Sequence, residues 1–119
     1  VITGQKRSAS VNETVLRISS GAARYVNIAT VTNLSRELQI LKDNGFWIYG
    51  ADMAGTTSYK TKFALRSVIV MGSEGAGLSR LISENCDEIV SIPMSGHIDS
   101  LNVSVAAGIL LYEVRRNQN

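Results

Sequence analysis

The chain has 119 residues, of which 45% are hydrophobic and 18% are charged. This composition is typical of a chain that folds around an apolar core, and it excludes a disordered tail or a solvated coiled coil. The single cysteine, Cys86, has no partner for an intrachain disulfide, and no apolar run is long enough to cross a membrane. We therefore expect one domain over residues 1–119, in the reducing environment of the cytoplasm.

The net charge of +2 is unevenly distributed along the chain. Residues 1–66 contain nine Lys and Arg against four Asp and Glu, whereas residues 67–119 contain three against six. A basic half can bind a polyanion, although scattered surface charge gives the same totals. The basic side chains considered for such a surface include Lys6, Arg7, Arg24, Lys60 and Lys62.

Short β-rich runs alternate with helical patterns in the first part of the chain. The chain begins inside a predicted strand at residues 1–4, and a capping-box spacing predicts a helix over residues 10–20. A run rich in β-branched residues predicts a buried strand over residues 25–31. Leucines on one helical face predict a helix over residues 34–43, capped by Asn33 and ended by Asn44 and Gly45.

The same alternation continues to the end of the chain. Residues 53–66 are polar and show no period, which predicts a surface loop or a short helix. Strands separated by helical segments are typical of an α/β fold, with a parallel sheet that carries helices on both faces. The remaining predicted strands lie at residues 46–49, 67–71 and 88–92, and the remaining helices at residues 78–84 and 102–116.

Three loops follow predicted strands, at residues 50–52, 72–77 and 93–100. Ligands of open parallel sheets bind beyond the carboxyl ends of the strands. The glycine-rich middle loop has neither the dinucleotide spacing nor the ending of a P-loop. Its carboxylate, Glu74, would repel a pyrophosphate and suits hydroxyls, amines or a cation. A tight turn without any ligand would also explain these glycines.

The third loop places several polar side chains directly before the last predicted helix. Ser100 and Asn102 could belong to a site, or one of them could simply cap the helix. His97 has no metal-ligand partner at a suitable spacing and Asp99 suits a turn, so neither is favoured as a catalytic base. Cys86 lies near a helix end without an activating base and is predicted to be buried and inert.

The two loops together resemble motifs of a known family. Residues 70–78 resemble the second motif of the SpoU (TrmH-like) RNA 2′-O-methyltransferases, and residues 92–94 with residues 100–108 resemble their third motif. Other segments, such as residues 6–9, are similar to the RlmB-like branch that acts on ribosomal-RNA guanosines. The resemblance covers essentially the whole chain.

The resemblance implies a sheet whose C-terminal part is threaded into a deep trefoil knot, which general rules of chain topology disfavour. It also implies S-adenosylmethionine bound within the knot, RNA as substrate, and a homodimer with the last helix near the interface. The sulfonium methyl of this cofactor is already activated, so the chemistry does not require a metal. By position in the motifs, Gly72, Ile92 and Leu101, with Met94 as a weaker addition, match cofactor-binding residues. Glu74, Ser100 and Asn102 match polar residues near the reacting centre.

The predicted reaction is methyl transfer to a ribose 2′-hydroxyl, of a guanosine in large-subunit rRNA or of tRNA. The family's first motif ends in an arginine that assists the hydroxyl, and it would precede residue 1, so the chain is expected to be an N-terminally truncated catalytic domain that is weak or inactive alone. Two alternatives are a catalytically silent module for dimerisation or RNA binding, and a phospho-receiver with Asp52 as acceptor. The acidic pair and the late lysine of a receiver are not found in the sequence.

Overall fold

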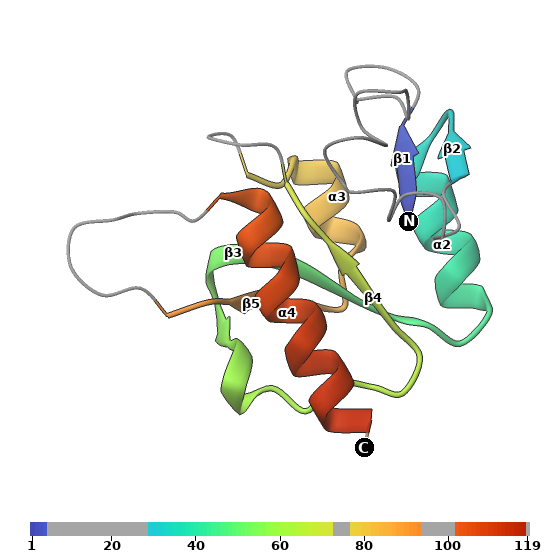
Figure 1. Ribbon diagram of the computed structural model, residues 1–119. Coiled ribbons are helices and arrows are strands. Elements are labelled where there is room, and N and C mark those ends of the chain that lie inside the picture. Colours follow the sequence, from blue (N-terminus) through green and yellow to red (C-terminus); the bar gives the residue numbers. More distant parts are fainter. Residues whose placement is uncertain (5–28, 73–76, 94–101, 119) are drawn as a thin grey trace, which may run out of the picture. The chain divides into compact units, whose positions relative to one another are not determined.

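The computed structural model describes residues 1–4, 29–72, 77–93 and 102–118 (Figure 1). They belong to two units, Val1–Glu37 and Leu38–Asn119. In the first unit, β1 (Ile2–Gly4) and β2 (Ala29–Val31) pair in parallel. The strand expected at the start of the chain is confirmed. Of the buried strand expected at residues 25–31, the described part is β2, and its first two residues are exposed. The helix predicted over residues 10–20 lies outside the described residues.

The helix α2 (Leu34–Asp43) has the two ends that the sequence predicts. At its start, Asn33 Oδ1 accepts a hydrogen bond from Arg36 N at 3.1 Å, which satisfies one of the free amides of the first turn. After its last residue, Gly45 has a φ of +87°, a left-handed conformation that glycine adopts without a Cβ penalty. A side-chain cap therefore fixes the start of this helix, and the backbone conformation of a glycine fixes its end.

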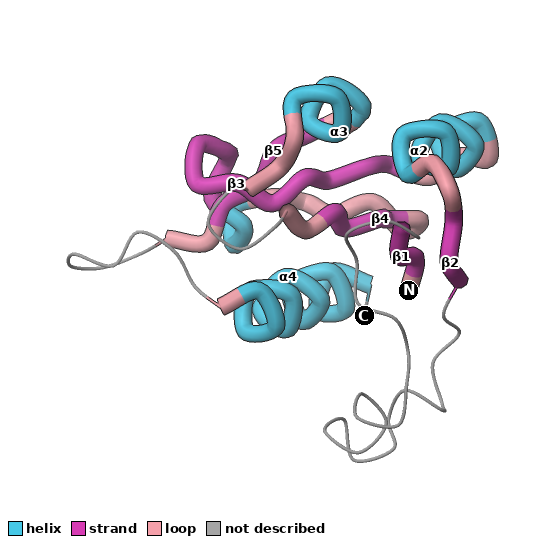
Figure 2. The backbone as a smooth tube through the Cα atoms, turned by 90° about the horizontal axis from the view of Figure 1, so that it is seen from above, coloured by secondary structure: helices cyan, strands magenta, loops and turns pink. Residues whose placement is uncertain are grey.

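The second unit is built on a three-stranded parallel sheet in the order β4-β3-β5. The strands are β3 (Trp47–Thr57), β4 (Ser67–Val70) and β5 (Glu88–Ser91). The helices α3 (Arg80–Asn85) and α4 (Val103–Gln118) lie on opposite faces of this sheet (Figure 2). The predicted parallel α/β arrangement is thus confirmed, and the carboxyl ends of the three strands share one edge.

The central strand β3 differs from the sequence prediction, which ended it at the turn of residues 50–52. Ala51 and Thr56 both pair with Val90, so residues 52–55 bulge out of the ladder and the chain then returns to it. The prediction of a strand end is wrong because β5 accepts the chain a second time. Ser91 Oγ fixes the return by donating a hydrogen bond to the carbonyl oxygen of Gly55 at 2.9 Å.

The surface loop or short helix predicted over residues 53–66 is wrong for residues 53–57, which belong to β3. The remainder of this segment, residues 58–66, follows that strand. It contains a single 3₁₀ turn, η2 (Ser58–Lys60), which confirms the short helix. The segment is nevertheless anchored, because Ser58, Thr61 and Phe63 are buried. One 3₁₀ turn is too short to show an amphipathic repeat, so the sequence gives no periodic sign of this burial.

The core of the second unit is formed by Tyr49, Phe63, Val90 and Leu110. The rings of Tyr49 and Phe63 are 4.7 Å apart between centroids and tilted by 57°, a favourable aromatic geometry. Leu110 is fully buried and comes from α4, which packs against β4 and η2. The Tyr49 hydroxyl accepts a hydrogen bond from Ala64 N at 2.8 Å, so the buried ring keeps a partner for its polar end.

The pKa of Tyr49 is raised above its ordinary value of 10.0, chiefly by burial. A raised folded-state pKa contributes stability that is fully present below pH 10.0 and is lost as the pH rises through the folded-state pKa. We expect Tyr49→Phe to cost about 1–3 kcal/mol at neutral pH, because Ala64 N loses its acceptor. The variant should also lose less stability than the wild type above pH 10.0. Urea unfolding across this pH range measures both effects, and identical pH profiles would contradict the second.

Candidate functional site

The carboxyl edge of the sheet gathers segments that are far apart in the sequence (Figure 1). Residues 52–55 leave the ladder in the bulge of β3, residues 71–72 follow β4, and residues 92–93 follow β5. The side chains of Met71 and Ile92 are half-buried and pack against the core cluster. The edge therefore has an apolar floor next to backbone that has left the ladder, in the position where parallel sheets bind ligands.

Gly72 lies against the chain's own backbone. A Cβ atom at this position would overlap the carbonyl group of Gly77 and lie 2.5 Å from Leu78 N. Gly77 itself has a φ of +69°, and a Cβ built on it would lie 3.7 Å from Asp52 Oδ2. The glycine-rich loop thus closes on itself at Gly72, and its last residue faces the start of the β3 bulge. The tight-turn explanation for these two glycines is supported.

The loop end also packs onto the middle of the sheet. A Cβ on Gly50 would lie 2.8 Å from Leu78 Cδ1 and 2.7 Å from Cys86 Sγ, so both side chains cover β3 at this glycine. Cys86 donates a hydrogen bond from Sγ to Ile82 O at 3.3 Å, and burial raises the pKa of the thiol. A thiol with a raised pKa is a poor nucleophile, which agrees with the predicted inertness of Cys86, although Cys86 is only partly buried and not fully buried as predicted.

Asn102 caps the helix α4. Its Oδ1 accepts hydrogen bonds from Ser104 N at 2.9 Å and from Ser104 Oγ at 2.5 Å. Its carbonyl oxygen accepts the first helical bond, from Ala106 N at 2.9 Å. Of the two roles considered for Asn102, capping is confirmed.

Of the predicted site residues, Gly72, Ile92 and Asn102 lie among the described residues. The structure brings Gly72 and Ile92 to the same edge of the sheet, because β4 and β5 flank β3 on its two sides. The others lie outside the described residues: Glu74, Met94, Ser100 and Leu101, together with His97 and Asp99. Within the described ranges, His, Cys, Asp and Glu form no group of three or more that could hold a metal.

Sequence reasoning missed the contribution of the β3 bulge to this edge. A Cβ on Gly55 would lie 2.7 Å from Val90 N and closer still to the carbonyl group of Ile89, so the returning chain passes directly against β5. The signal was present, because an isolated glycine in a strand pattern indicates a bulge or a close backbone approach.

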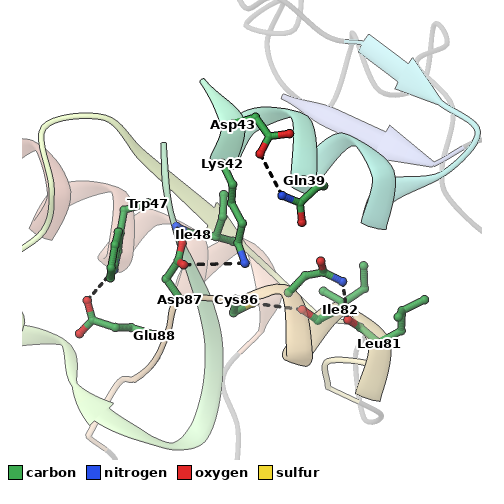
Figure 3. A network of polar contacts seen from close by, with 11 residues as sticks. Gln39, Lys42, Asp43, Trp47, Ile48, Leu81, Ile82, Cys86, Asp87 and Glu88 are labelled. Atoms are coloured by element: carbon green, nitrogen blue, oxygen red, sulfur yellow. Dashed lines mark hydrogen bonds and ion pairs between the residues drawn. The ribbon is translucent and has the colours of Figure 1, made fainter. Parts of the chain in front are cut away.

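A network of polar contacts lies at the opposite edge of the sheet, where the amino ends of the strands meet (Figure 3). Asp87 Oδ2 accepts a hydrogen bond from Ile48 N at 2.7 Å, and Asp87 N donates to Ile48 O at 2.8 Å. Lys42 Nζ lies 3.8 Å from Asp87 Oδ1, and Trp47 Nε1 donates to Glu88 Oε2 at 2.8 Å. These contacts join the amino ends of β3 and β5 and so help to set the strand register that builds the carboxyl edge.

Comparison with known proteins assigns the chain to a family. The family model described as the SpoU rRNA Methylase family matches residues 1–112. The chain belongs to this family. Membership confirms the resemblance seen in the two loop motifs and replaces the phospho-receiver alternative. In the described part of this SpoU family chain, no helix combines the length and the apolarity that crossing a membrane requires.

Relatives and solved structures agree with the SpoU assignment. The chain is 51% identical, over its whole length, to a Borreliella burgdorferi protein named "Uncharacterized tRNA/rRNA methyltransferase", of which it covers 53%. The chain spans about half the length of the curated relatives it matches.

Crystal structures with a similar fold include two members of the same family. The A. aeolicus TrmH/SpoU tRNA modifying enzyme has 32% identity and a TM-score of 0.84, with 98% of this chain and 60% of that chain covered. The SpoU methyltransferase AviRb from Streptomyces viridochromogenes, in complex with AdoMet, has 26% identity and a TM-score of 0.87, with 98% and 49% covered.

Proposed function

We propose that this SpoU family chain is the cofactor-binding and catalytic domain of an RNA methyltransferase that uses S-adenosylmethionine. The observation that carries the proposal is the carboxyl edge, where Gly72, which lies against the backbone of Gly77, and Ile92 follow the strands on either side of β3. The similar fold of AviRb, solved with AdoMet, supports the choice of cofactor. When bound, S-adenosylmethionine supplies a methyl group that its sulfonium already activates for transfer.

The residues at the edge fit such a molecule. Met71 and Ile92 form an apolar floor, and residues 52–55 leave the ladder beside them. A mostly apolar surface with a few placed polar groups is typical of sites that bind an adenosine-sized ligand. We propose that Gly72 and Ile92 hold the cofactor with Leu101 and Met94, and that the carboxylate of Glu74 favours its positive charge.

The acceptor we propose is a ribose 2′-hydroxyl, in a guanosine of large-subunit rRNA, with tRNA as the other candidate. A ribose hydroxyl is a poor nucleophile near neutral pH, so a neighbouring group must help to remove its proton. Placing the hydroxyl in line with the methyl group supplies much of the remaining rate. Glu74, Ser100 and Asn102 are the polar residues to which we assign orientation of the ribose.

The chain also offers a surface for the proposed homodimer. Val105, Ile109 and Tyr112 are exposed and lie at i, i+4 and i+7 of α4, so they share one side of the helix. A stripe of this kind is typical of a helix that packs on a partner. We propose that α4 pairs with a second copy, that the C-terminal part of the chain is threaded into a trefoil knot, and that the protein acts in the cytoplasm.

The proposal is tested by binding and by transfer. Calorimetry should show saturable binding of S-adenosylmethionine to the folded chain, and labelled cofactor should transfer its methyl group to rRNA or tRNA. A 2′-O-methyl group blocks alkaline hydrolysis at its own phosphodiester, so resistance to alkali locates the product. A folded chain that binds no cofactor contradicts the proposal. Binding without transfer to any RNA, also by a longer chain that includes the family's first motif, favours a catalytically silent module instead.

Asn102 can be tested separately from its cap. Asn102→Ala should cost about 1 kcal/mol in the free energy of unfolding, because α4 loses its N-cap. Asn102→Asp keeps a capping oxygen but removes the amide donor, so we expect nearly unchanged stability and at least tenfold slower methyl transfer. Equal rates for Asn102→Asp and the wild type would limit Asn102 to capping.

A further inference from the structure

The segment around η2 presents side chains that the proposed methyl-transfer site does not use. Tyr59 is 59% exposed, and Lys60 and Lys62 are exposed as well. Between them, the segment is held by buried residues with exposed fractions of 3% for Ser58, 8% for Thr61 and 5% for Phe63. Thr61 adds two hydrogen bonds, from N to Ser58 O at 3.1 Å and from Oγ1 to Thr57 O at 3.0 Å. The exposed side chains of Tyr59, Lys60 and Lys62 are therefore attached to a backbone that buried neighbours hold in place.

The outward side chains combine an aromatic ring with positive charge. Lys60 Nζ lies 6.0 Å from the centroid of the Tyr59 ring. From residue 53 to residue 66 the sequence contains Lys60, Lys62 and Arg66 but neither Asp nor Glu. Aromatic rings flanked by lysines are typical of surfaces that bind single-stranded nucleic acid, because bases stack on the ring and phosphates contact the cations.

The position of the segment connects it to the carboxyl edge. Thr57 pairs with Ser91, the last residue of β5, so η2 begins where β5 ends and Ile92 follows (Figure 1). The helix α4 also packs against η2. Tyr59 therefore follows by two positions the residue that pairs with the end of β5, and Lys60 and Lys62 come next on the stretch that leads from this edge back to β4.

We propose that Tyr59 stacks on an unpaired base of the RNA substrate while Lys60 and Lys62 contact the flanking phosphates. The proposal rests on the proposed function for its substrate class and adds the surface that receives the RNA. RNA is favoured over a second copy of the chain, because two copies meeting at this segment would bring like charges together without an acidic residue to offset them.

The test measures the affinity of the chain for a fluorescently labelled, unpaired RNA oligonucleotide by anisotropy at several salt concentrations. Tyr59→Leu should weaken binding about 5- to 150-fold, the range of one lost base stack, while Tyr59→Phe should bind like the wild type. Lys60→Gln with Lys62→Gln should reduce the slope of log affinity against log salt by about 1.4. Arg36→Gln, which removes an exposed charge on α2, is the control and should change neither quantity.

The outcomes separate this inference from the proposed function. Calorimetry with S-adenosylmethionine accompanies every variant, and all of them should bind the cofactor like the wild type. If the wild type binds and methylates RNA but Tyr59→Leu binds it equally well, the stacking proposal fails alone. If the wild type binds no RNA, both proposals fail. If Tyr59→Leu changes the oligomeric state and not the RNA affinity, the segment is a protein interface and the inference is overturned.

Discussion

Gly55→Ala is expected to lower the free energy of unfolding by about 3 kcal/mol. The added Cβ would lie 2.7 Å from Val90 N and nearer still to the Ile89 carbonyl group. Both obstacles are backbone atoms of β5, which cannot turn aside as a flexible side chain would. The strand pair must separate instead, at the upper end of the cost of overpacking. Urea unfolding followed by circular dichroism measures this loss.

A second glycine provides the matched control for this prediction. Gly108 lies in α4, and a Cβ built on it would have nothing within 4 Å. Gly108→Ala should therefore raise stability by about 0.5–1 kcal/mol, since alanine is the better helix former. If both substitutions changed the free energy of unfolding by the same amount, the close approach of the β3 bulge to β5 would be contradicted.

The elements that the sequence predicts well are those whose signals are local. Asn33 and Gly45 mark the ends of α2 through a side-chain cap and a left-handed residue, and neither needs a distant partner. The course of β3 is different. Its return to the ladder depends on Ser91, which lies 36 residues from Gly55 in the chain. Such a pairing is decided by tertiary contacts, so the sequence shows a suggestive glycine but not the extended strand.

The sequence predicts which residues meet at the candidate site, but not how the strands are ordered around it. Loops after parallel strands share an edge, which is why Gly72 and Ile92 could be placed together before the fold was known. The order β4-β3-β5, which puts them on either side of β3, is not contained in the order of the strands along the chain. The sequence also does not show that the backbone of Gly77 approaches Gly72. A glycine allows the close approach of a ligand as readily as that of another backbone segment.

Gly72→Ala is expected to weaken the proposed binding of S-adenosylmethionine about 100-fold, equivalent to ~2.7 kcal/mol. Its Cβ would overlap the carbonyl group of Gly77, so the loop cannot close and its backbone moves away from the edge that Ile92 shares. Gly72 follows Val70, the last residue of β4, by two positions, so the sheet should stay folded. Calorimetry with S-adenosylmethionine, together with a circular dichroism spectrum that matches the wild type, provides the measurement.

Gly77→Ala distinguishes loop closure from a general sensitivity of this loop. Among the described residues, a Cβ on Gly77 meets Asp52 Oδ2 at an ordinary contact distance of 3.7 Å, so the penalty comes from the φ of +69°. That conformation costs an alanine roughly 1–2 kcal/mol without blocking the approach of the two backbone segments. Gly77→Ala should therefore retain more cofactor affinity than Gly72→Ala. If Gly72→Ala bound the cofactor as tightly as the wild type while remaining folded, closure of this loop would have no part in the site, and binding would have to rest on Ile92 and the start of α4.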